Sequence, residues 1–131
     1  MKAYSLLICL LALFLFAGTS CEDKVIDQEF SLEISKLYTS NDGNYSVIIN
    51  NVSDSRCPEG VQCIWQGEVT VSGEMNVDGS KLPFEVHSVE SQSNKQPEGY
   101  TIKIVDAKPY PKYGTESKPE DLIVILLVKK N

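Results

Sequence analysis

Apolar and polar residues alternate along most of the chain after its first twenty residues. Five runs have this period of two, and their apolar positions are Phe30, Leu32 and Ile34; Tyr45, Val47 and Ile49; Val69, Val71 and Met75; Leu82, Phe84 and Val86; and Tyr100, Ile102 and Ile104. Such alternation is typical of a β-strand that buries one face. No window shows the spacing and caps of an amphipathic helix, so the pattern predicts an all-β fold.

A sixth run, residues 122–128, reads LIVILLV and is apolar at every position. It is too short to cross a bilayer as a helix, which takes roughly 20 residues. We therefore expect a central strand that is covered on both faces.

The dipeptide Asp78-Gly79 stands between two alternating runs and is a strong signal for a two-residue hairpin turn. A turn closed by Val77 and Ser80 pairs Met75 with Leu82, Gly73 with Phe84 and Val71 with Val86. The same register places Pro83 where its missing N–H points away from the hairpin partner, which predicts a sheet edge on its other side.

The strands together predict one antiparallel β-sandwich domain of six to seven strands over residues 29–131. An immunoglobulin-like arrangement is one form of such a sandwich, and a small closed barrel is the alternative. Two long connections interrupt the spacing. Residues 88–99 are polar and expected to be mobile, and residues 107–121 are expected to run extended across the surface.

The N-terminus adds a targeting signal, because Lys2 precedes an apolar run over residues 6–17 and small residues follow. This pattern predicts a signal peptide over residues 1–20. Cys21 then stands in a context that resembles a bacterial lipoprotein processing site, in which the cysteine becomes the lipidated first residue. Residues 21–28 would form the lipidated N-terminus and a tether. Because Gly18 replaces the usual aliphatic residue of such sites, ordinary cleavage that leaves Cys21 as a free thiol is the alternative.

Cysteine parity favours the lipid. The chain has 4 cysteines, and Cys9 leaves with the signal peptide. If lipid caps Cys21, then Cys57 and Cys63 remain as a pair, whereas three free thiols would leave one without a partner.

The balance of charge limits the partners. The chain carries 12 basic and 18 acidic side chains, a net charge of -6. A chain with this acidic balance is not expected to bind nucleic acid, and it has no polybasic patch for anionic lipid. Membrane attachment would therefore rest on the lipid anchor.

The segment SRCPEGVQCIWQGEV, residues 55–69, holds both remaining cysteines with five residues between them. Redox dithiols usually have two residues between the cysteines, and structural zinc needs four ligands where this chain adds only His87. We therefore expect a structural disulfide, no metal and no cofactor. A closed loop of this kind is preorganised for binding, which makes its interior a candidate site. The interior consists of Pro58, Glu59, Gly60, Val61 and Gln62.

The alternation of the hairpin can be carried backwards from Val69. It then places Cys63 and Trp65 on the inward face and Ile64 on the outward face. The disulfide and the tryptophan are expected to touch the core.

No nucleophile and base can be assembled from the sequence, so no enzymatic activity is expected. His87 is predicted opposite Thr70 on the outer sheet face, as a solvated residue. The acidic residues of that face are expected to be solvated rather than a glycosidase pair. Tyr110 and Tyr113, between prolines, form a second candidate surface for sugar or peptide; the alternative is that they cover the end of the core.

Two segments, DSRCPEGVQCIWQGEV at residues 54–69 and GYTIKIVDAKPYP at residues 99–111, resemble a pattern found in small secreted bacterial lipoproteins. The shared features are an Arg-Cys-Pro stretch, a Cys-x-Trp-x-Gly stretch and a late strand that leads into Pro-Tyr-Pro. The resemblance covers residues 54–128. It implies a single small β domain at the cell envelope and carries no catalytic residue across.

These observations predict a lipid-anchored protein of the bacterial cell envelope, at the outer membrane on its periplasmic or surface face, with secretion as the alternative. It is expected to act as a binding or structural module toward an envelope protein or a glycan. One rival is an enzyme inhibitor that presents the loop closed by Cys57 and Cys63. The other is an envelope hydrolase, which requires a concave pocket that gathers His87, a carboxylate and a hydroxyl.

Overall fold

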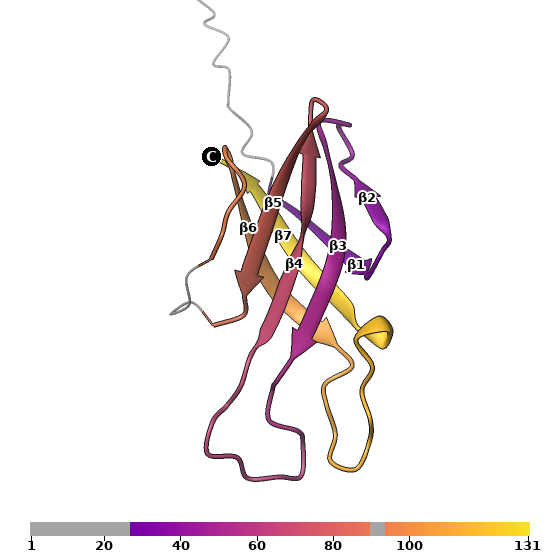
Figure 1. Ribbon diagram of the computed structural model, residues 1–131, viewed down its shortest axis with the longest axis vertical. Helices are drawn as coiled ribbons and strands as arrows, with labels where there is room; N and C mark the ends of the chain where they lie inside the picture. The colour runs from indigo at the N-terminus through magenta and orange to yellow at the C-terminus, as the bar shows by residue number, and fades with distance from the viewer. Residues whose placement is uncertain (1–26, 90–93) are drawn as a thin grey trace, which may run out of the picture.

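The computed structural model describes residues 27–89 and 94–131. The predicted signal peptide, the predicted lipidation at Cys21 and most of the tether lie outside the described residues, as do residues 90–93 of the first long connection. The described chain forms two antiparallel sheets that face each other (Figure 1). No helix in this part of the chain is long and apolar enough to span a membrane.

The first sheet has three strands in the order β1-β7-β6, and the second has four in the order β2-β3-β4-β5. The three-stranded sheet consists of β1 (Gln28–Glu33), β6 (Tyr100–Lys108) and β7 (Ile123–Lys130). The four-stranded sheet consists of β2 (Leu37–Thr39), β3 (Tyr45–Asp54), β4 (Val69–Val77) and β5 (Ser80–His87). A 3₁₀ turn, η2 (Pro119–Asp121), precedes β7. The predicted all-β antiparallel sandwich is confirmed, and the described strands do not close into the alternative small barrel.

The connections differ from those of an immunoglobulin domain. Neighbouring strands in each sheet are consecutive in the chain, except that β1 pairs with β7. Immunoglobulin domains use Greek-key connections, which make neighbours of strands far apart in sequence. The described strands are therefore a sandwich of meanders closed by the first and last strands, and the immunoglobulin-like form was wrong.

One hydrophobic core fills the space between the sheets. Its members are Phe30, Leu32, Tyr45, Val47, Ile49, Val52, Val69, Val71, Met75, Phe84, Val86, Tyr100, Ile102, Ala107, Leu122, Val124, Leu126 and Val128. All five alternating runs contribute to it in the predicted phase. Burial of these side chains, at roughly 25 cal/mol per Å² of apolar surface, is the main favourable term for folding.

The hairpin of β4 and β5 has the register predicted from its turn. Val77 pairs with Ser80, Glu74 with Pro83, and Thr70 with His87. β5 lies at the edge of its sheet, as Pro83 predicted. Beyond this edge, within the described residues, Glu85 and Lys95 form an isolated bridge of two backbone hydrogen bonds of 2.9 and 2.7 Å, and the N–H of His87 donates to Oδ1 of Asn94 at 2.8 Å.

Two β-bulges change the phase of strands. The register shifts between Ile49 and Asn51 in β3, and between Ile104 and Asp106 in β6. After each bulge the opposite set of residues points inward, so Val52 and Ala107 are buried. A strict alternation does not predict either shift.

Strand β7 is central, as predicted, but its two faces differ. Val124, Leu126 and Val128 are buried in the core, whereas Ile123 on the other face is 42% exposed. The next two outer residues, Ile125 and Leu127, are half-buried. The prediction that this strand is covered on both faces is therefore wrong for the described chain, because the outer face of its sheet carries no second layer.

Different segments of the chain lie at the two ends of the sandwich. Gln28 pairs with Val128, and Lys108 pairs with Ile123 at the other end of β7. The first described residues therefore lie at one end, and the loop that joins β6 to β7 lies at the other, beside the loop between β3 and β4 (Figure 1).

Candidate functional site

Two long loops leave the sandwich at the same end. The disulfide loop, residues 55–68, joins β3 to β4, and the tyrosine loop, residues 109–118, leads from β6 toward η2 and β7. They come from different sheets and project in the same direction (Figure 1). We call the two loops together the loop end.

The disulfide loop begins with a narrow neck. The N–H of Ser55 donates to the carbonyl of Glu68 at 2.8 Å, and the N–H of Cys57 donates to the carbonyl of Gln66 at 2.9 Å. Gly67 has a φ of +69°, and a Cβ at this position would collide with the carbonyl of Ser55. Only glycine therefore allows the two sides of the neck to approach so closely.

The tip of this loop is closed by the predicted disulfide, which is confirmed. Cys57 and Cys63 are bonded, with their Cα atoms 5.9 Å apart. Of the candidate residues inside the ring, Pro58 is half-buried and residues 59–62 are exposed. Closing a seven-residue ring of this kind stabilises the folded state by roughly 2 kcal/mol in the chain-entropy model.

The tryptophan does not pack in the core. Trp65 is 82% exposed and Ile64 is 93% exposed, and Cys63 is exposed as well. The regular pairing of β3 with β4 ends at Asp54 and Val69. The alternation of β4 therefore does not predict which way the side chains before Val69 point. The predicted contact of Trp65 and Cys63 with the core is therefore wrong.

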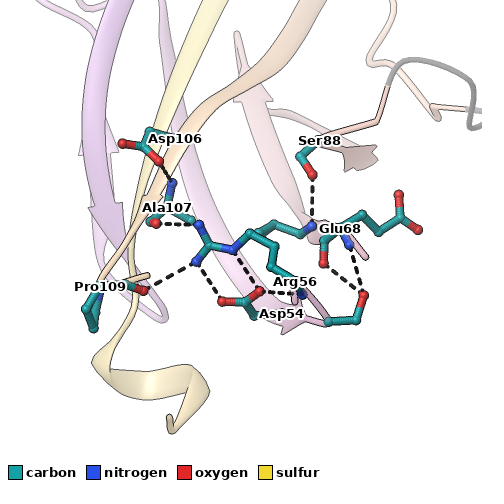
Figure 2. A network of polar contacts seen from close by, with 9 residues as sticks. Asp54, Arg56, Glu68, Ser88, Asp106, Ala107 and Pro109 are labelled. Carbon is teal, nitrogen blue, oxygen red and sulfur yellow. Dashed lines mark hydrogen bonds and ion pairs between the residues drawn. The ribbon is translucent and has the colours of Figure 1, made fainter. Parts of the chain in front are cut away.

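Arg56 joins the disulfide loop to the opposite sheet. Its Nε and one terminal nitrogen donate to the two carboxylate oxygens of Asp54, at 2.9 and 2.7 Å. Its terminal nitrogens also donate to the carbonyls of Ala107 at 2.9 Å and Pro109 at 3.3 Å, as Figure 2 shows. The guanidinium lies 4.7 Å from the ring centre of Tyr110. One side chain thus holds both loops.

This network is largely removed from water. The side chains of Arg56 and Asp54 are 12% and 7% exposed. The hydrogen bonds to Asp54 raise the pKa of Arg56 above its ordinary value, against the opposing effect of desolvation. The guanidinium is therefore a permanent charge, satisfied by one carboxylate and two carbonyls.

A second connection runs through the backbone. The N–H of Glu59 donates to the carbonyl of Pro111 at 2.9 Å, and the N–H of Tyr113 donates to the carbonyl of Glu59 at 3.1 Å. The two candidate sites predicted separately, residues 58–62 and the tyrosine pair, are therefore one surface. Tyr113 is 77% exposed, so it does not cover the end of the core.

The loop end exposes a set of large apolar side chains: Val61, Ile64, Trp65, Tyr110 and Tyr113. Tryptophan and tyrosine are enriched among residues that dominate binding energy. The alternation placed Ile64 outward, where it lies, but it placed Trp65 inward and so missed the tryptophan as a surface residue. Gly67 was the available signal, because a glycine just before a strand often marks a close backbone approach that interrupts the pleat.

His87 is not the solvated residue that was predicted. Its side chain is only 16% exposed, and its Nδ1 lies 3.5 Å from Glu68 and 3.1 Å from the hydroxyl of Thr70. Glu85 approaches its Nε2 at 3.7 Å. The Glu68 oxygen that faces the ring is buried and has no hydrogen bond within the described residues.

His87 and Thr70 lie side by side on the outer face of the four-stranded sheet. His87 borders an open hollow of about 370 Å³. Thr70 lies inside the four-stranded sheet, where the backbone of β4 is paired on both sides. No group of three or more His, Cys, Asp or Glu side chains in residues 27–89 and 94–131 is arranged to hold a metal ion.

Comparison with protein-family models finds no match for this chain, and no curated protein and no solved structure matches it either.

Proposed function

We propose that the protein is a lipid-anchored binding module of the bacterial cell envelope, and that it recognises an envelope protein or a glycan with its loop end. The observation that supports this best is the construction of that end. Arg56 and the backbone of Glu59 join loops from two sheets, and the joined loops expose Trp65, Ile64 and Tyr113. Rigid aromatic side chains on a preorganised support lose little entropy when they bind.

The placement of the loop end is consistent with an anchor at Cys21. The first described residues lie beside the last residues of β7, and the loop end lies beyond its first residue. β7 has 8 residues, which corresponds to a length of about 26 Å. A lipid on Cys21 would therefore leave the loop end facing away from its membrane.

The anchor is tested by growing a bacterial host that expresses the full chain with a palmitate analogue. We expect the wild-type chain to be labelled and Cys21→Ser to carry no label. The matched control is the double variant Cys57→Ser with Cys63→Ser, which should keep the label. A label that persists in Cys21→Ser would overturn the lipid anchor.

The binding role is tested by capture of envelope proteins and glycans on the purified full chain. Trp65→Ala and Tyr113→Ala should each weaken retention of a specific partner by about tenfold or more, as expected for exposed aromatic anchors. Leu37→Ala is the matched control, because Leu37 is an exposed apolar residue of β2 outside the loop end. Equal retention by all three variants would contradict a role for the loop end.

An enzyme inhibitor is the second candidate. The exposed residues 59–62 project from a ring closed by the disulfide and held at its base by Pro111 and Tyr113, as inhibitory loops require. The domain should then slow an envelope enzyme in proportion to its concentration, and reduction of the disulfide should abolish the effect. Inhibition that is unchanged by reduction would exclude this loop as its cause.

A further inference from the structure

The outer face of the three-stranded sheet is unusually apolar. Its central column consists of Ile123, Ile125 and Leu127, all partly exposed. The corresponding column on β4 of the other sheet is polar and consists of Thr70, Ser72, Glu74 and Asn76. Since a sheet face in water ordinarily carries polar residues, a column of branched apolar side chains indicates a face that is covered in the working protein.

The columns on either side have opposite character. On β1, Glu29, Ser31 and Glu33 are exposed, while the residues between them are buried. On β6 the outer residues that pair with β7 are Thr101, Lys103, Asp106 and Lys108. The sheet therefore has an acidic side, an apolar centre and a mainly basic side, on which Lys108 also lies 3.6 Å from Asp106 of its own strand.

The register aligns these columns into rows across the sheet. The rows are Glu29, Leu127 and Lys103; Ser31, Ile125 and Asp106; and Glu33, Ile123 and Lys108. Two of the rows run from a carboxylate through an apolar residue to an ammonium group. The middle row runs from a hydroxyl through an apolar residue to a carboxylate.

We propose that this face binds the same face of a second copy of the chain, with a two-fold axis that runs along β7. Rotation about this axis exchanges the columns of β1 and β6 and keeps each row in place. Glu29 then faces Lys103 of the second copy, Glu33 faces its Lys108, and the apolar columns meet. An axis across the strands would instead place each carboxylate column against itself, which like-charge repulsion disfavours.

Lys129 and the middle row, which contains Ser31 and Asp106, are also compatible with this arrangement. Lys129 continues the central column and would meet its own counterpart, but Asp27 lines the same hollow of about 200 Å³ and brings a carboxylate to this end. Ser31 faces Asp106 of the second copy and can donate its hydroxyl to that carboxylate. A self-complementary patch of this kind is what an isologous interface requires.

The size of the face sets the expected strength. Three strand spacings and eight residues of rise give a face of about 14 Å by 26 Å. Its area is smaller than the roughly 800 Å² that each partner buries in a standard interface. We therefore expect a weak, reversible dimer. The axis along β7 also places the first described residues of both copies at one end and both loop ends at the other, so two copies on one membrane would meet in the required orientation.

The test uses charge reversal in the full chain. Dimerisation is measured by sedimentation equilibrium in a density-matched detergent, with fewer protein molecules than micelles. Glu29→Lys and Lys103→Glu should each weaken the dimer by about tenfold, because two symmetry-related contacts become repulsive. The two changes together in one chain should restore it. A mixture of the two single variants should form a mixed dimer, since their columns are complementary again.

The control is Lys81→Glu, which reverses an exposed charge on β5 of the other sheet and should leave dimerisation unchanged. Circular dichroism checks that each variant is folded. In intact cells, Ile125→Cys should be cross-linked between copies and Ser72→Cys should not. A wild-type chain that stays monomeric at all concentrations would overturn the proposal. A dimer whose dissociation constant is unchanged by Glu29→Lys and Lys103→Glu would also overturn it. Cross-linking of Ile125→Cys to a different protein alone, and never to a second copy, would do the same.

Discussion

At the scale of single residues, Arg56 carries the most information about the loop end. It occupies one position in an Arg-Cys-Pro stretch, where nothing in the local pattern assigns it a contact. In the structure it is the point where three segments meet, because it binds Asp54 beside it and two carbonyls that lie more than fifty positions later. Planar guanidinium groups suit such a role, since their donors form a rigid fork.

Replacement of Arg56 by alanine should lower the free energy of unfolding by about 3 kcal/mol, because it leaves the carboxylate of Asp54 buried without its partner. Arg56→Lys should recover only part of the loss, since an ammonium group cannot reach the carboxylate and both carbonyls. Urea denaturation measures both. Lys81→Ala removes an exposed pair with Glu74 and should change stability by less than about 0.5 kcal/mol. Equal effects of Arg56→Ala and Lys81→Ala would contradict this assignment.

Tyr45 predicts a dependence of stability on pH. Burial raises its pKa from 10.0 to about 12. The unfolded chain releases this proton near pH 10 while the folded chain keeps it, so the free energy of unfolding should fall between about pH 10 and pH 12.

The variant Tyr45→Phe isolates this effect. It loses the hydrogen bond to Gln28 and should be less stable at neutral pH, but its stability should fall less steeply over the alkaline range. Denaturation curves at intervals of pH test this. Parallel loss of stability in the two proteins would show that other groups cause the alkaline effect.

At the scale of elements, the strands follow from the sequence and the loops do not. Alternation identified five strands, and the Asp-Gly turn identified the register of one hairpin, because both depend on neighbours close in sequence. The short strand β2 and the two bulges were not predicted. A bulge inserts one residue opposite a partner strand, and that partner is known only once the sheet is formed.

The neck of the disulfide loop gives a test at this scale. Gly67→Ala should lower the free energy of unfolding by about 3 kcal/mol, because the new Cβ meets the carbonyl of Ser55 and the neck has to open. Gly60→Ala is the matched control: Gly60 also has a positive φ but has open space around it, so the cost should be about 1 kcal/mol. Thermal and urea denaturation compare the two. Equal losses would show that only the backbone angle matters.

At the scale of the whole molecule, the single tryptophan reports orientation. Trp65 is the only tryptophan and lies in the loop end, beyond the end of β7 that is distant from Gln28. If lipid on Cys21 anchors the chain, brominated lipids should not quench its fluorescence in vesicles. Acrylamide in the surrounding water should quench it efficiently, since the indole is exposed. Quenching by the lipids would place the loop end at the membrane and contradict the proposed orientation.

The sequence by itself determined the all-β class, the strands that form the core and the disulfide, because each depends on local periodicity or on the number of available partners. The tertiary structure alone decided where those elements turn. It exposed Trp65, since the regular ladder between β3 and β4 begins only at Val69, and it enclosed His87 beside Glu68 and Glu85. It also joined residues 58–62 to the tyrosine loop and aligned an acidic, an apolar and a mainly basic column on one sheet face. Such contacts join positions far apart in the chain, and only the pairing of strands and loops brings them together.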